Sequence, residues 1–148
     1  MGVFMYKDKK VFINICLIIL QLPQLLVGLL LMLLLWNYKV YTNPYNHISV
    51  LKVNHKGWFG TACFSCGPII FVTPYASEEI LKHETGHSVQ STRFLILYLF
   101  IVAIPSVFLF LYRRIAKKSL YWYNSKWPES QANRLSNIDL SVYKQFIK

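Results

Sequence analysis

Charged residues, and acidic ones above all, are scarce in this sequence. Only 15% of the 148 residues are charged, with six Asp and Glu against sixteen Lys and Arg, whereas 55% are hydrophobic. This composition argues against an ordinary soluble domain and predicts a membrane protein. The chain also lacks internal repeats, low-complexity tracts and flexible linkers, and its length allows a single domain, 1–148.

Cysteines are few as well. Cys63 and Cys66 form a Cys-x-x-Cys pair, which can bind metal, form a disulfide or carry redox chemistry. No second pair accompanies it, and no thioredoxin-like βαβ pattern surrounds it. We therefore favour a structural role for both cysteines.

Basic residues give the chain a formal net charge of +10, which alone would suit nucleic acid. They stand beside apolar segments, however, at Lys7, Lys9, Lys10, Arg113, Arg114, Lys117 and Lys118. This placement is typical of cytoplasmic flanks that contact anionic lipid. The expected partner is therefore a lipid bilayer and not nucleic acid.

Two long apolar segments account for the hydrophobicity. Val11–Trp36 is long enough to cross a bilayer, and because no cleavage site precedes Tyr38 we expect it to be retained. Phe94–Tyr112 has Pro105 in its middle, so the region 94–123 either spans the membrane or forms a hairpin within it. The expected location is the bacterial cytoplasmic membrane.

Residues 37–76 contain the only clear strand signals and predict a small β region. Ile48–Val53 alternates apolar and polar residues, and Ile69–Thr73 is a β-branched run. The second strand could bind an extended substrate by strand addition, or it could pair with the first strand and meet no ligand. The predicted fold class is a mainly α membrane protein with this hairpin or sheet before a zincin-type helix.

The segment 77–92 is predicted to be the helix that carries the chemistry. Ser77, followed by two acidic residues, is typical of a helix start. His83 and His87 would project from one face and bind one Zn²⁺ ion, and Glu84 is placed to act as general base on a metal-bound water. The pattern alone also allows a polar helix with two unrelated histidines.

A catalytic zinc site needs a third protein ligand, and Glu129 is the best candidate. Pro128 suits the first turn of a new helix, so 127–148 is predicted to hold a third-ligand helix and a tail. Asn133 would share a face with Glu129 and could bond the free ring nitrogen of a ligating histidine.

Other polar and aromatic side chains near these motifs allow two interpretations. Gln90 and Gln131 could line the cleft, although a polar helix face is the simpler account. Tyr121, Trp122 and Tyr123 could supply a phenol for an oxyanion, although such a cluster beside an apolar segment is more typical of an interfacial belt.

His83-Glu84-Thr85-Gly86-His87, an apolar stretch and then Glu129-Ser130-Gln131-Ala132-Asn133 resemble the membrane gluzincins, which include the CAAX prenyl endopeptidases and the bacterial heat-shock membrane protease. The resemblance covers roughly residues 77–136. In that group the third ligand opens a Glu-x-x-Ala-Asp pattern, and this chain has Asn133 in place of the aspartate. The resemblance implies Zn²⁺ as cofactor, held by the two histidines and Glu129.

The site sets a condition on the second apolar segment. One straight pass would place the histidines and Glu129 about 30 Å apart. A helical hairpin broken at Ile104-Pro105-Ser106 would return Glu129, because its arms would measure about 27 Å and at most about 36 Å. Two straight spans would instead satisfy the positive-inside rule, by which basic flanks lie in the cytoplasm. We give closure of the zinc site precedence and predict the hairpin.

The predicted function is an integral membrane zinc metalloprotease, a hydrolase whose substrate is a peptide or protein that can itself be membrane-associated. Two alternatives stay open. One is a non-catalytic small membrane protein with a structural or interaction role, and the other is a membrane protein that binds metal without hydrolysis. The sequence does not indicate an oligomeric state.

Overall fold

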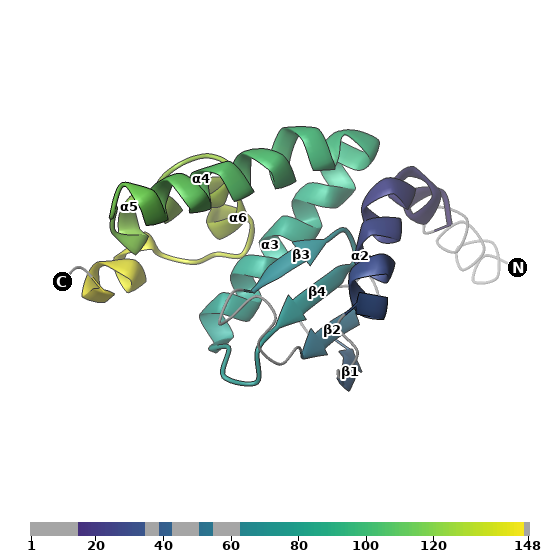
Figure 1. Cartoon of the computed structure of the whole chain (residues 1–148), viewed down its shortest axis with the longest axis horizontal. Helices are drawn as coiled ribbons and strands as arrows, with labels where there is room; N and C mark the ends of the chain where they lie inside the picture. The colour runs from purple at the N-terminus through teal and green to yellow at the C-terminus, as the bar shows by residue number, and fades with distance from the viewer. Residues whose placement is uncertain (1–14, 35–38, 43–50, 55–62, 147–148) are drawn as a thin grey trace, which may run out of the picture.

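The computed structural model describes residues 15–34, 39–42, 51–54 and 63–146 (Figure 1). Its strands are β1 (Lys39–Thr42), β2 (Leu51–Asn54), β3 (Phe64–Cys66) and β4 (Ile69–Val72). Its α-helices are α2 (Leu22–Leu34), α3 (Glu78–Phe94), α4 (Ile104–Ile115), α5 (Leu120–Asn124) and α6 (Glu129–Leu135). Shorter helical turns are η1 (Leu95–Leu97), η2 (Leu99–Ala103, a π-helical segment) and η3 (Leu140–Phe146).

The strands form one four-stranded sheet in the order β1-β2-β4-β3. β2 and β4 are parallel, with Leu51 opposite Ile69, and β3 pairs antiparallel with β4. The strand predicted at 69–73 is confirmed as β4, whereas positions 48–50 of the other predicted strand lie outside the described residues. β4 has β2 on one side and β3 on the other, so of the two interpretations of this strand the structure supports pairing with the other predicted strand and leaves no free edge for a substrate strand.

The sheet lies between two helices, with α2 on one face and α3 on the other (Figure 1). All four side chains of β4 are buried. Ile69 and Phe71 pack towards α2, whereas Ile70 and Val72 pack with Leu81 of α3. This two-sided burial explains why β4 reads as a continuous apolar run, and it anchors α3 to the sheet.

Helix α3 forms as predicted. The Ser77 hydroxyl accepts a hydrogen bond from the Ile80 amide, and Glu78 and Glu79 stand in the first turn, where acidic side chains favour a helix N-terminus. The helix ends where Leu95 adopts a φ of 51°, an uncommon value for a residue other than glycine.

The predicted hairpin at Pro105 is wrong, because the chain reverses earlier, at Leu95. From there η1, η2 and α4 follow one another and lead back from the end of α3 towards α5 (Figure 1). Pro105 is the second residue of α4, which begins directly after η2. The wider π turn lets the helix pass a residue that has no amide donor, so the proline does not end it.

The prediction of a membrane protein with transmembrane helices, set in the bacterial cytoplasmic membrane, is also corrected. Within the described ranges, no helix is both long and apolar enough to cross a bilayer. The first apolar segment is interrupted at Gln21, which leaves α2 with 13 residues, or about 20 Å. The second is divided among η1, η2 and α4, and α4 has 12 residues.

Pro23 has no amide donor for the preceding turn, which accounts for the break at Gln21, and buried hydrogen bonds hold the glutamines beside it. The Ser91 hydroxyl of α3 donates to Gln21 Oε1 at 2.6 Å, and Gln24 Nε2 donates to the Leu95 carbonyl at 2.9 Å. Both glutamines are buried against the end of α3. The polar residues that interrupt the first apolar segment therefore face protein and join this segment to α3.

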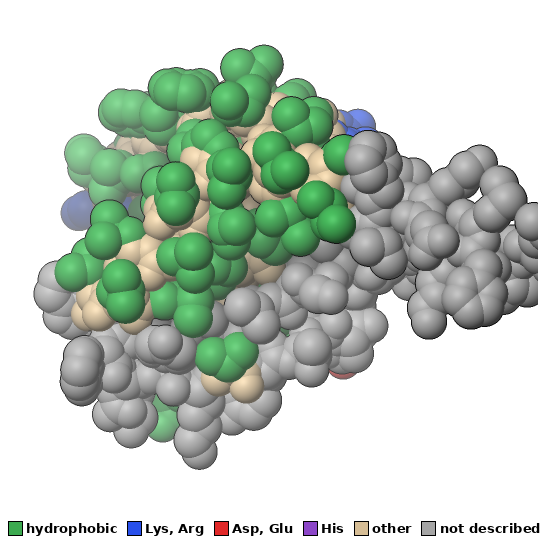
Figure 2. Space-filling model, turned by 90° about the vertical axis from the view of Figure 1, so that its right-hand side faces the viewer, with side chains coloured by type: hydrophobic (Ala, Val, Ile, Leu, Met, Phe, Trp, Pro, Cys, Tyr) green, Lys and Arg blue, Asp and Glu red, His purple; other side chains and the backbone are tan. Residues whose placement is uncertain are grey.

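Large apolar side chains remain exposed on the outer surfaces of α2 and of the run from Leu95 to Ile115 (Figure 2). On α2 they include Leu26, Leu30 and Leu33, spaced so that they share one face. Along the second run they include Phe100, Ile104, Val107, Phe108, Leu111 and Ile115. No residue of α4 is buried, so its apolar stripe points away from the core of the described chain.

Candidate metal centre

The candidate metal centre lies where α6 packs against α3. Gly86 faces α6, and a Cβ atom at this position would clash with the carbonyl oxygen of Ala132. Ser136, just beyond α6, donates a hydrogen bond to the carbonyl oxygen of Lys82. The glycine inside His83-Glu84-Thr85-Gly86-His87 thus permits the close approach that brings Glu129 to the histidines.

His83, His87 and Glu129 converge, although more than forty positions separate Glu129 from each histidine in the chain. Glu129 Oε2 lies 2.9 Å from His83 Nε2 and 3.1 Å from His87 Nε2, and the two Nε2 atoms are 3.2 Å apart. All three side chains are buried. They form a possible metal-binding triad.

The outer ring nitrogens of both histidines meet amide oxygens. His83 Nδ1 lies 2.8 Å from Asn133 Oδ1, and His87 Nδ1 lies 2.7 Å from Gln90 Oε1. Asn133 Oδ1 also accepts from the Tyr143 hydroxyl at 3.2 Å, while Asn133 Nδ2 donates to the Asn124 carbonyl. Asn133 thus presents its oxygen to His83, as a carboxylate would.

The hydrogen bonds at the two Nδ1 atoms determine whether each inner Nε2 atom is a donor or an acceptor. Each Nδ1 donates its proton to an amide oxygen, so each Nε2 of a neutral imidazole carries a lone pair. Two lone pairs and a carboxylate oxygen then face one another within 3.2 Å. Three acceptors at this range repel one another unless a proton or a metal cation lies among them.

The triad fits a metal ion of the size of Zn²⁺. Zinc bonds of about 2.0–2.2 Å in a tetrahedron separate the ligand atoms by about 3.3–3.6 Å. The observed separations of 2.9–3.2 Å need an outward shift of only a few tenths of an ångström. Two imidazoles and one carboxylate are also a ligand set used by catalytic zinc sites, which keep a further position open.

Charge in the site is divided unequally between its two carboxyl groups. Burial disfavours ionised Glu129, but His87 and His83 outweigh it and hold the pKa of Glu129 well below its usual range. Burial raises the pKa of Glu84 to about 8; His83 opposes this rise and Glu129 adds to it. Burial would lower the pKa of His87, yet Glu129 and Gln90 leave it raised.

Glu84 adjoins the triad without belonging to it. Its carboxyl group is buried, and its Oε2 atom has no hydrogen-bond partner in the part of the chain that the structure describes. A buried carboxyl oxygen without a partner is costly in a purely structural role. A water molecule or substrate group beside the triad would be a suitable partner for it.

Of the three clustered aromatics, Tyr123 is the one associated with the site. Its hydroxyl lies 3.3 Å from Ser106 Oγ, and the residue is half-buried. Burial, and then the nearby charge of Glu129, raises the pKa of this phenol well above its usual value. This placement leaves both sequence interpretations of Tyr123, phenol donor and interfacial residue, as predictions.

Sequence reasoning missed the contact between Gln90 and His87. Gln90 was interpreted as part of a polar helix face, but its side chain is fully buried. Its position three residues beyond His87 on the same helix is the signal that could have identified it, because residues three apart share a face.

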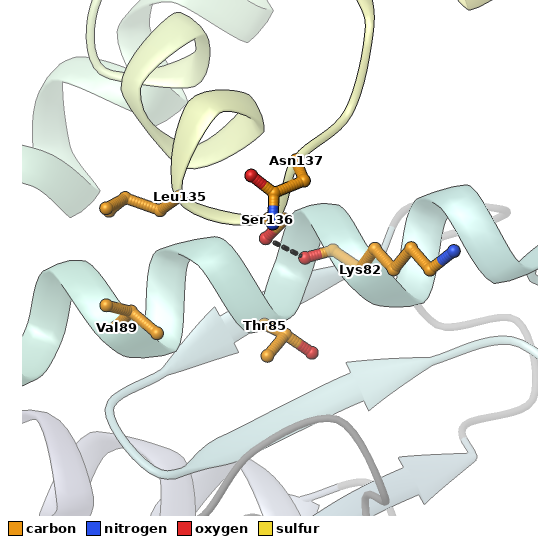
Figure 3. A pocket seen from close by; sticks show the side chains of 6 residues that line it. All are labelled: Lys82, Thr85, Val89, Leu135, Ser136 and Asn137. Atoms are coloured by element: carbon orange, nitrogen blue, oxygen red, sulfur yellow. Dashed lines mark hydrogen bonds between the residues drawn. The ribbon is translucent and has the colours of Figure 1, made fainter.

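A separate cavity of about 390 Å³ lies between α3 and the end of α6 (Figure 3). Its lining residues are Lys82, Thr85, Val89, Leu135, Ser136 and Asn137. None of them belongs to the triad. The cavity therefore occupies a different face of α3 from the candidate metal centre.

Cys63 and Cys66 are both free thiols. Cys66 packs with Ile69 and Phe71 in the core, and burial, with a further contribution from Glu84, raises the pKa of its thiol to about 12. Burial also raises the pKa of Cys63. Neither cysteine belongs to the metal-binding group found among the described residues.

Comparisons with protein-family models, with curated proteins and with solved structures found no match to this chain. The resemblance to gluzincins therefore stays a prediction carried by the motifs alone. The geometry of the triad is the independent observation that bears on function.

Proposed function

We propose that this protein is a zinc-dependent metallopeptidase. The observation that carries the proposal is the buried convergence of His83, His87 and Glu129, whose inner atoms are all acceptors and call for a cation. The sequence motif could arise by coincidence, but a coincidental motif does not explain why a glutamate so far along the chain meets both histidines.

His83, His87 and Glu129 would hold the metal, and Asn133 and Gln90 would orient the imidazoles. A bound zinc ion supplies Lewis acidity, which lowers the pKa of water and polarises a carbonyl group. Glu84 is the general base: its unpartnered carboxyl oxygen accepts a proton from the attacking water and later returns it to the leaving amine.

The state of Glu84 fits this role. In the metal-free protein burial raises the pKa of its carboxyl group to about 8, so the protonated form prevails at neutral pH. A dication beside it would favour the ionised form, which is the form that accepts a proton. A peptide bond is the expected substrate, because zinc, a general base and a water molecule are the elements needed to hydrolyse it.

The test combines metal analysis with peptide hydrolysis. We expect one zinc ion per chain and cleavage of quenched fluorescent peptide mixtures. Glu84→Gln should retain zinc and lose about 10²–10⁴-fold in turnover, because only the base is removed. Glu79→Gln is the matched control, since Glu79 is exposed on the same helix, and its turnover should equal that of the parent chain.

The alternatives make different predictions in the same experiment. A chain that binds no stoichiometric metal would be non-enzymatic, with a structural or interaction role. A chain that binds zinc and shows no cleavage dependent on Glu84 would be a metal-binding protein without hydrolysis. Either result would overturn the proposed peptidase.

A further inference from the structure

Gln90 is a fully buried amide placed between the two helices of the metal centre. Its Oε1 atom lies 2.7 Å from His87 Nδ1. Its Nε2 atom donates to the Pro128 carbonyl at 3.0 Å and to Gln131 Oε1 at 2.8 Å. One side chain thus contacts one candidate ligand and the residue that immediately precedes another, Glu129.

The partners of Gln90 determine which way its amide faces. A backbone carbonyl can only accept a hydrogen bond, so the amide nitrogen must face Pro128. The amide oxygen then faces His87 and accepts the proton of Nδ1. The other tautomer of His87 would place a proton on Nε2, where the cation binds, and would leave two acceptors facing each other at Nδ1.

We propose that Gln90 is a positioning residue of the metal site, which holds His87 in the tautomer protonated at Nδ1 and ties the start of α6 to α3. This inference rests on the proposed zinc site and deepens it. Asn133 performs the first task for His83, from α6. Gln90 performs it from α3 and, through Pro128, also sets the position of Glu129 relative to the histidines.

The expected effect is a loss of metal affinity. Removing a partner that orients a ligating histidine typically costs about 10–100-fold in affinity. We expect Gln90→Leu to weaken zinc binding by this factor, measured by competition with a chromophoric chelator. In the metal-free chain with ¹⁵N-labelled histidine, ring signals should show His87 protonated at Nδ1 in the parent and a mixture of tautomers in Gln90→Leu.

Two further variants separate positioning from general loosening of the fold. Gln24→Leu is the matched control, because Gln24 is an equally buried glutamine that donates to Ser91 and to the Leu95 carbonyl, away from the triad. It should lose stability and keep the zinc affinity of the parent. Gln90→Glu retains an acceptor for Nδ1 but loses the donor to Pro128, so it should restore only part of the affinity that Gln90→Leu loses.

Equal zinc affinity in the parent and Gln90→Leu, or an equal loss in Gln90→Leu and Gln24→Leu, would overturn the inference. If Gln90→Leu does not fold, the parent spectrum decides, recorded without metal at a pH high enough to leave the His87 ring neutral: a neutral ring protonated at Nε2 contradicts the inference, and one protonated at Nδ1 supports it. A parent chain that binds no zinc refutes the proposed function itself, whereas a zinc-binding parent indifferent to Gln90 refutes only this inference.

Discussion

The α3–α6 contact and the outer surface of α2 and α4 differ in how they place polar and apolar groups. Between α3 and α6, polar side chains are buried and bonded to one another, as His83, Glu129 and Asn133 show. On the other surface, apolar side chains such as Leu33 and Phe108 are exposed. The two regions invert the usual distribution, in which burial follows hydrophobicity.

In this chain, therefore, the hydrophobicity of a segment does not indicate how deeply it is buried. The helix that carries the histidines is polar and lies at the centre of the packing, whereas the most hydrophobic segments supply the exposed stripes. Burying polar groups is costly unless each finds a partner. The α3–α6 contact meets that demand largely through side-chain hydrogen bonds, and its inner acceptors point to a cation.

Of the changes in the two regions compared, Gly86→Ala should produce the largest effect on stability. The added methyl group would clash with the Ala132 backbone, so α6 must move away from α3, at a cost of about 3 kcal/mol or more in the free energy of unfolding. Denaturant unfolding measures it. Gly28→Ala in α2 is the control: its methyl group would lie 3.0 Å from Ile69 Cδ1 and 3.2 Å from Cys66 Cβ, which shifts of a few tenths of an ångström relieve, and the higher helix propensity of alanine keeps the cost below about 1 kcal/mol. Equal losses of unfolding free energy in the two variants would show that the α3–α6 contact is no closer than the contact of α2 with the sheet.

Zinc should stabilise the α3–α6 region by an intermediate amount. At a free concentration of one hundred times its dissociation constant, a ligand that binds only the folded state contributes about 2.7 kcal/mol. For a chain of this length the Tm should rise by about 5–10 °C. Glu129→Ala should abolish the rise, because a ligand is lost, whereas Phe108→Ser should retain it. A zinc-dependent rise that survives in Glu129→Ala would place the metal elsewhere.

The apolar surface should give the smallest effects. Leu33→Ser and Phe108→Ser change side chains that are 74% and 69% exposed, so the free energy of unfolding should move by no more than about 0.5 kcal/mol. Phe71→Ala, in the core of the sheet, should cost about 3–5 kcal/mol by comparison. Unfolding measurements on the three variants would contradict the contrast if the surface pair lost as much as the core variant.

Local features of the chain were predictable where short-range chemistry decides them. The hydroxyl of Ser77 and the acidic residues after it indicated the start of α3, and the β-branched run at 69–73 indicated β4. The spacing of His83 and His87 placed two imidazoles on one helix face. Glu129 and Asn133 were identified as partners because a zinc site needs a third ligand and because its histidines need acceptors for their outer protons.

Long-range features were not predictable in the same way. The reversal at Leu95 depends on a backbone conformation with positive φ, at a position where the sequence has no glycine to indicate it. Pro105 suggested a break in the helix that the π turn of η2 avoids. The role of Gln90 depends on where α6 comes to lie, since its donors meet Pro128 and Gln131 only in the folded chain. The hydrophobicity of the two apolar segments likewise predicted membrane-spanning helices, although Gln21 interrupts the helix of the first segment.

The sequence by itself determined the chemical groups of the candidate centre: two imidazoles one helical turn apart, a neighbouring carboxyl group at Glu84, and a distant Glu129 with Asn133 on its helix. Tertiary structure alone decided that these groups meet, because the meeting requires the turn at Leu95 and the absence of a side chain at Gly86. The physical reason is range. Helix caps and periodicity act over a few residues, whereas the approach of α6 to α3 is decided by packing and hydrogen bonds between segments more than forty residues apart.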